Sequence, residues 1–95
     1  MRRTISILLL WAGAAMAGAP LDAAREAFVK GDYQKAISLA RPLVPTEPAA
    51  AWRVIGASTC FLKDQPGARE AYDKLGPEGQ QFLRYVCKRN GVVVP

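Results

Sequence analysis

The two cysteines of the chain, Cys60 and Cys87, are the residues whose type most readily does chemistry. A cysteine pair can close a disulfide, exchange electrons as a dithiol or hold a metal. The separation of 27 positions does not match the Cys-x-x-Cys spacing of thiol oxidoreductases and zinc sites. An even number of cysteines in an exported chain favours a disulfide. We therefore expect a structural Cys60–Cys87 bond, and the alternative is a small thiol-dependent redox factor of the cell envelope.

The other residue types that catalysis needs are missing or poorly arranged. The sequence contains no histidine, which removes the commonest general base and the most frequent metal ligand. It has no glycine-rich phosphate loop either. The carboxylates of Glu70 and Asp73 stand beside Arg69 and Lys74, as in the solvated ion pairs of an exposed helix face. We expect no enzyme, and neither a cofactor nor a metal.

The first residues have the layout of a secretory signal peptide. Met1-Arg2-Arg3 precedes an apolar run over residues 5–16, and Ala15-Met16-Ala17 has the small-x-small pattern of a cleavage site. The apolar run is shorter than the roughly 20 residues that span a bilayer. The sequence therefore predicts a signal peptide over residues 1–17, export to the periplasm or the extracellular space, and no stable membrane anchor after cleavage.

Removal of this segment leaves a small and only weakly basic chain. It has 95 − 17 = 78 residues, with 13 − 2 = 11 Lys and Arg against 8 Asp and Glu, which is a net charge of +3. That charge is weak evidence for nucleic acid or a membrane surface, and we expect no nucleic-acid partner. A hydrophobic core is marginal at this size, so a covalent cross-link is expected to matter. We predict one helical domain over residues 18–91 and a tail over 92–95, whose valines have no obvious strand to pair with.

A repeat of 32 positions organises this domain. Aligning residues 20–44 with 52–76 superposes Asp32 on Asp64, and it superposes Ala36 on Ala68 and Leu43 on Leu75 in the same way. A period in the thirties is typical of stacked helix-turn-helix units, which commonly bind other proteins.

Apolar spacing predicts five helices and an all-α fold. Gly31 suits the left-handed end of the first helix, Asp32 suits the N-cap of the second, and Pro42 predicts a kink or an early end near Arg41. The predicted helices cover residues 20–30, 33–44, 50–62, 65–75 and 77 to the Asn90-Gly91 stop.

These residues together resemble the tetratricopeptide repeat over roughly residues 20–90. The motif is carried by Gly31-Asp32-Tyr33-x-x-Ala36, Pro48, Trp52-x-x-Ile55-Gly56, Ala68, Tyr72 and Leu75. The resemblance implies two helical hairpins followed by a C-terminal capping helix. It also implies that Ala24, Ala36, Gly56 and Ala68 let the helices of a hairpin approach closely. The chain departs from the family at Thr59, where an aromatic residue is usual, and at Pro42.

The resemblance implies a peptide groove lined by the first helix of each hairpin. The matching positions are Leu21, Arg25, Phe28, Val29, Arg53, Ala57, Phe61, Arg84 and Lys88. Because guanidinium groups bind carboxylates bidentately, the expected partner is an acidic segment or the C-terminal carboxylate of a protein. The alternative is that the arginines only solvate exposed faces and the phenylalanines belong to the core. The expected function is an exported, non-enzymatic adaptor or scaffold, and self-association stays open.

Overall fold

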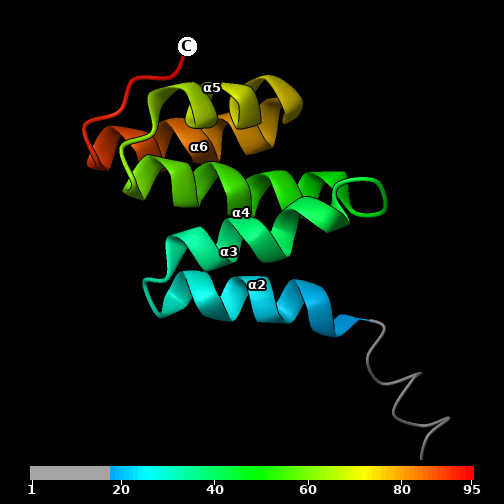
Figure 1. Ribbon diagram of the computed structural model, residues 1–95. Helices are drawn as coiled ribbons and strands as arrows, with labels where there is room; N and C mark the ends of the chain where they lie inside the picture. The colour runs from blue at the N-terminus through cyan, green and yellow to red at the C-terminus, as the bar shows by residue number, and fades with distance from the viewer. Residues whose placement is uncertain (1–17) are drawn as a thin grey trace, which may run out of the picture.

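The computed structural model describes residues 18–95 (Figure 1). Residues 1–17 lie outside the described part, and with them the signal peptide and the cleavage site that the sequence predicts. Export therefore stays a prediction.

The described residues form an all-α structure, which confirms the predicted fold class. Its elements are α2 (Ala19–Val29), α3 (Tyr33–Ala40), the 3-10 helix η2 (Arg41–Leu43), α4 (Pro48–Phe61), α5 (Gln65–Lys74) and α6 (Pro77–Arg89).

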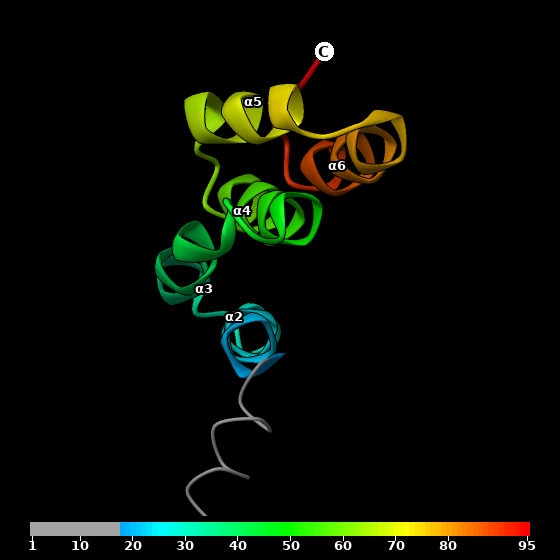
Figure 2. The ribbon, with the colours of Figure 1, turned by 90° about the vertical axis from the view of Figure 1, so that its right-hand side faces the viewer.

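The helices stack as two hairpins and a last helix. Helix α2 packs on α3, α4 packs on α5, and α6 packs mainly on α4. Figure 2 looks roughly along the axes of α2, α3 and α4, and it shows α2, α4 and α6 on one side, with α3 and α5 on the other. The side chains that α2, α4 and α6 direct away from α3 and α5 therefore share one face of the molecule.

The turns of the two hairpins repeat the same geometry. Gly31 has a φ of +83°, and the Asp32 carboxylate accepts a hydrogen bond from the Lys35 backbone N–H at 3.3 Å. In the second hairpin Lys63 has a φ of +57°, and Asp64 accepts from the backbone N–H of Gly67 at 3.1 Å. A left-handed residue followed by an aspartate N-cap thus occurs twice, and the predicted cap of the second helix is confirmed.

Exchanging the residue types at these two turns is expected to change stability in opposite directions. Gly31→Ala should lower the free energy of unfolding by about 1 kcal/mol, because a β-carbon disfavours positive φ. Lys63→Gly should raise it by up to about 1 kcal/mol for the same reason. Urea unfolding followed by circular dichroism measures both changes.

The Lys63 side chain requires its own control, because its Nζ donates to the Asn90 carbonyl at 2.8 Å. Lys63→Met removes this hydrogen bond and keeps the strained backbone. Lys63→Gly should therefore be more stable than Lys63→Met; the reverse order would show that the left-handed conformation costs little here.

The proline in the second helix acts as predicted. Helix α3 ends at Ala40, and Pro42 lies in the 3-10 turn that follows. Proline lacks an N–H and its ring clashes with the carbonyl four residues earlier, so the α-helix cannot continue through it.

Small residues fill the contacts between helices. A β-carbon on Gly56 would lie 2.7 Å from Cδ1 of Leu83 and 3.1 Å from Cβ of Ala71. Gly56 therefore allows α4 to pack closely on α5 and α6 at one point. The fully buried alanines are Ala24, Ala36, Ala40, Ala51, Ala68 and Ala71.

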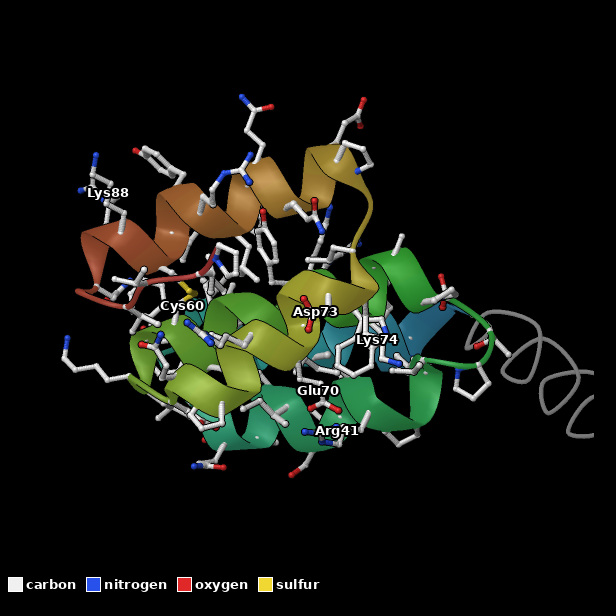
Figure 3. All side chains as sticks on the ribbon, turned by 90° about the horizontal axis from the view of Figure 1, so that it is seen from above. Arg41, Cys60, Glu70, Asp73, Lys74 and Lys88 are labelled. Carbon is white, nitrogen blue, oxygen red and sulfur yellow. A yellow bond between two sulfur atoms is a disulfide. The ribbon has the colours of Figure 1, made fainter. Side chains whose placement is uncertain are left out.

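The C-terminal residues belong to the core, although the sequence predicts a tail outside the helical domain. Val92 and Val94 are buried, whereas Val93 is 69% exposed. The Val92 N–H donates to the Cys87 carbonyl at 2.9 Å, which ties the segment to the end of α6. Figure 3 shows this segment running back beside α6 and α5.

Candidate functional site

The predicted disulfide is present between the last turn of α4 and the last turn of α6. Cys60 and Cys87 are bonded, with their Cα atoms 4.7 Å apart, and both residues are completely buried (Figure 3). Thiol–disulfide exchange requires a thiolate to reach one of the sulfur atoms. Burial therefore opposes the redox alternative and favours a structural role for the bond.

Two neighbouring cavities lie on the face shared by α2, α4 and α6. We call them together the aromatic groove, because Phe28 and Phe82 line both. The first cavity, of about 340 Å³, is lined by Arg25, Phe28, Val29, Ala50, Arg53, Val54, Ala57 and Phe82. The second, of about 260 Å³, is lined by Phe28, Phe61, Phe82, Tyr85, Val86, Arg89 and Asn90.

The aromatic rings of this groove contact one another and remain partly open to solvent. The ring centroids of Phe28 and Phe61 are 5.5 Å apart, and Phe61 stacks on Tyr33 at 4.8 Å. Phe61 is 40% exposed, Phe82 38% and Tyr85 63%. Exposed rings that gather at one place offer apolar area to a partner.

Arginines border the groove. The guanidinium of Arg53 lies 5.4 Å from the ring centroid of Phe82, and that of Arg89 lies 5.6 Å from the ring centroid of Tyr85. Arg25 lines the first cavity beside Arg53. Cation–π contact holds the face of a guanidinium against a ring and leaves N–H groups at its edge for a carboxylate. One N–H of Arg89 already donates to the Tyr85 hydroxyl at 3.3 Å. The residues that line the two cavities include no Asp or Glu, so the positive charge has no acidic counterpart there.

One carboxylate of α2 is paired away from this face. The Glu26 carboxylate lies 2.8 Å from Lys30 Nζ, and both residues line a separate shallow cavity between α2 and α3. The hydrogen bond and the charge of Lys30 lower the pKa of Glu26, and Glu26 raises the pKa of Lys30 in return. This surface pair does not neutralise the arginines of the aromatic groove.

The structure divides the nine positions predicted for the groove. Six of them line the aromatic groove, namely Arg25, Phe28, Val29, Arg53, Ala57 and Phe61, whereas Leu21 is buried. Arg84 and Lys88 instead line another cavity, of about 390 Å³, together with Gly91 and residues 92–94. The guanidinium of Arg84 lies over the ring of Tyr72 and donates to its hydroxyl. Arg84 and Lys88, unlike Arg89 of the same helix, therefore belong to a different surface.

Four further residues of α6, which were not predicted to belong to the groove, line it. They are Phe82, Tyr85, Val86 and Arg89. Their spacing of i, i+3, i+4 and i+7 places them along one side of a helix, and this was the signal available in the sequence.

Two kinds of feature were also searched for among the described residues, a metal-ligating cluster and a membrane-spanning helix. Residues 18–95 contain no group of three or more His, Cys, Asp or Glu side chains that could hold a metal ion. None of the helices within these residues is long and apolar enough to cross a membrane.

Comparison of the chain with protein-family models, curated proteins and solved structures finds no match. The likeness to the tetratricopeptide repeat thus stays a resemblance, and the function has to be argued from the groove itself.

Proposed function

We propose that the protein is an exported, non-enzymatic interaction module of tetratricopeptide-like type that captures an acidic segment of a partner protein in the aromatic groove. One observation carries the proposal: Arg25, Arg53 and Arg89 border a groove with an aromatic lining and no acidic residue. Unbalanced positive charge around apolar area is complementary to a segment that combines carboxylates with apolar side chains.

The two parts of the groove have separate roles in this binding mode. The first cavity, at about 340 Å³, falls within the range of ligand-sized pockets, and its Phe28 and Phe82 receive an apolar side chain. The arginines around it receive the flanking carboxylates. Direct contact between Arg53 and Phe82 fixes one of these cations before the ligand arrives, which lowers the entropy cost of binding.

The buried disulfide supports the proposed location outside the cytosol. Disulfides persist in oxidising compartments, which agrees with a signal peptide over residues 1–17 and with a periplasmic or extracellular site of action. In this proposal the bond stabilises the scaffold and takes no part in chemistry, because both sulfur atoms are buried.

Peptide selection tests the groove even while the partner is unidentified. Random peptides displayed on phage are panned on the folded domain, and we expect enrichment of sequences in which Asp or Glu flanks an aromatic or aliphatic residue. Fluorescence anisotropy then measures the affinity of one synthetic selected peptide. Arg25→Glu/Arg53→Glu should weaken it at least about tenfold, since losing two charge-assisted contacts costs more than about 1.4 kcal/mol.

A matched control keeps the same change in net charge at a distant place. Arg69→Glu/Lys74→Glu alters two exposed cations of α5, which lies on the other side of the molecule (Figure 2). This variant should bind the selected peptide nearly as well as the unaltered protein. Enrichment of basic peptides, or equal weakening by both double variants, would contradict the proposal.

A further inference from the structure

Helix α6 supplies one wall of the aromatic groove. Phe82, Tyr85, Val86 and Arg89 belong to this helix, and all four line the second cavity. Phe82 also lines the first cavity, opposite Phe28 of α2. Neither cavity therefore keeps its lining unless α6 lies against α4.

The packing that holds α6 in this place is sparse. Of its 13 residues only Gly79, Leu83 and Cys87 are buried, whereas α4 buries nine of its 14 residues. Cys87 is one half of the bond to Cys60 at the end of α4. Segments with few buried apolar contacts open locally at a lower free energy than the core does. Without the bond, α6 would depend mainly on the Leu83 side chain for its attachment.

The two hairpins have most of the core to themselves. In the cluster of buried apolar residues, only Leu83, Cys87, Val92 and Val94 come from α6 or from the segment after it. The other members lie within α2–α5, where α2 packs on α3, α3 on α4 and α4 on α5. Departure of α6 therefore opens the groove while the hairpins keep their own contacts.

We propose that the Cys60–Cys87 bond controls the aromatic groove, an inference that rests on the proposed capture of an acidic segment there. The reduced chain binds the segment weakly, and oxidation completes the site by fixing α6 against α4. In this step the two thiols lose two protons and two electrons to a disulfide-bearing oxidant, whose own S–S bond becomes two thiols.

The compartment determines when the groove becomes active in this proposal. Cytosolic thiols keep cysteine pairs reduced, so the chain does not bind its partner before export. After oxidation both sulfur atoms are completely buried, which protects the bond from further exchange. The bond therefore forms once and is not cycled, in contrast to that of a thiol-dependent redox factor.

Thermodynamic linkage makes this control reciprocal. The affinity of the reduced protein is lowered by the fraction of molecules in which α6 is docked. The ligand in turn favours the oxidised state over the reduced state by the ratio of the two affinities. A bond that stabilises the scaffold without affecting the groove would give a ratio of one.

Fluorescence anisotropy with the selected peptide compares the oxidised protein, the protein reduced with dithiothreitol, and Cys60→Ala/Cys87→Ala. Below room temperature, both forms without the bond should bind at least about tenfold more weakly, which corresponds to docked α6 in no more than about one molecule in ten. Dithiothreitol should not change the affinity of the double variant, and reoxidation with oxidised glutathione should restore that of the reduced protein.

Hydrogen exchange followed by NMR distinguishes local opening from general unfolding. In both forms without the bond, the amides of residues 83–87 should lose protection, whereas those of residues 33–40 and 65–74 should stay protected. Equal loss of protection throughout residues 18–95 would overturn the proposal, because the bond would then support the whole fold and not the groove.

Equilibration with dithiothreitol tests the reciprocal effect. Saturating peptide should shift the ratio of oxidised to reduced protein at least about tenfold toward the oxidised form. Arg25→Glu/Arg53→Glu, which should bind the peptide poorly, should show a much smaller shift. If the oxidised protein binds the peptide and both forms without the bond bind it equally well, this proposal fails and the proposed function stands. If the oxidised protein does not bind it, both fail.

Discussion

Removal of the Cys60–Cys87 bond should lower the free energy of unfolding by about 3 to 4 kcal/mol. The bond closes a loop across 27 positions, and a loop of that length gives this value through the lost entropy of the unfolded chain. A domain of 78 residues is expected to have only about 4 to 12 kcal/mol in total, at roughly 0.05 to 0.15 kcal/mol per residue. The protein should therefore be close to unfolding at 37 °C without the bond.

The double variant Cys60→Ala/Cys87→Ala measures this loss. A single variant is unsuitable, because it leaves an unpaired thiol buried between α4 and α6. Urea unfolding of the double variant is compared with that of the oxidised protein, whose bond is verified by intact mass, and with that of the reduced protein. The reduced protein and the double variant should lose similar stability. A loss below about 1 kcal/mol in both would show that packing alone holds α6 in place.

Leu83→Ala is the second change with a large expected effect. Leu83 is completely buried at the contact of α6 with α4, and truncation of a buried leucine to alanine costs about 2 to 5 kcal/mol. Thermal and urea unfolding measure the loss. Tyr85→Ala is the matched control on the same helix, because Tyr85 is 63% exposed and should cost much less.

The neighbouring glycine makes this prediction sharper. Gly56→Ala alone should destabilise by about 1 to 3 kcal/mol, because the new β-carbon overlaps Leu83 and presses on Ala71. In the Leu83→Ala background the same change should cost much less, since only the close approach to Ala71 remains and alanine favours a helix by about 1 kcal/mol over glycine. Additive effects in this double-mutant cycle would mean that the two helices are not in close contact at Gly56.

Local features of the fold could be predicted because their causes lie within a few residues. Asp32 caps its helix through its own side chain, and Pro42 ends one through its own ring. The repeat of 32 positions likewise placed the second turn at Asp64, where the structure has it. Such features depend on short-range chemistry that the sequence displays directly.

The rotation of α6 could not be predicted so easily, because its sequence offers two polar flanks. Burial of Leu83 and Cys87 against α4 fixes which side faces inward. That orientation directs Phe82 and Arg89 to the aromatic groove and Arg84 to the opposite flank. In the sequence, Arg84, Lys88 and Arg89 look alike as exposed cations of one helix. Only tertiary packing assigns Arg89 to the aromatic groove and the other two to a different cavity.

The burial of the C-terminal valines was also beyond local reasoning. An isolated run of three apolar residues does not show which surface it will cover. In the structure, Lys63 in the turn before α5 donates to the Asn90 carbonyl, and Gln65 at the start of α5 donates to the Val93 carbonyl, both across a long sequence separation. These contacts depend on the hairpin already being folded.

The position of the cross-link makes the two walls of the aromatic groove unequal in stiffness. The disulfide joins α4 to α6, and α5 lies in the loop of chain that this bond closes. The bond therefore restrains the wall that α4 and α6 form. Helix α2 lies outside this closed loop and is held by noncovalent packing on α3 and α4. In the proposed binding mode we therefore expect a larger ligand to displace α2 outward, while the aromatic residues of α6 keep their positions.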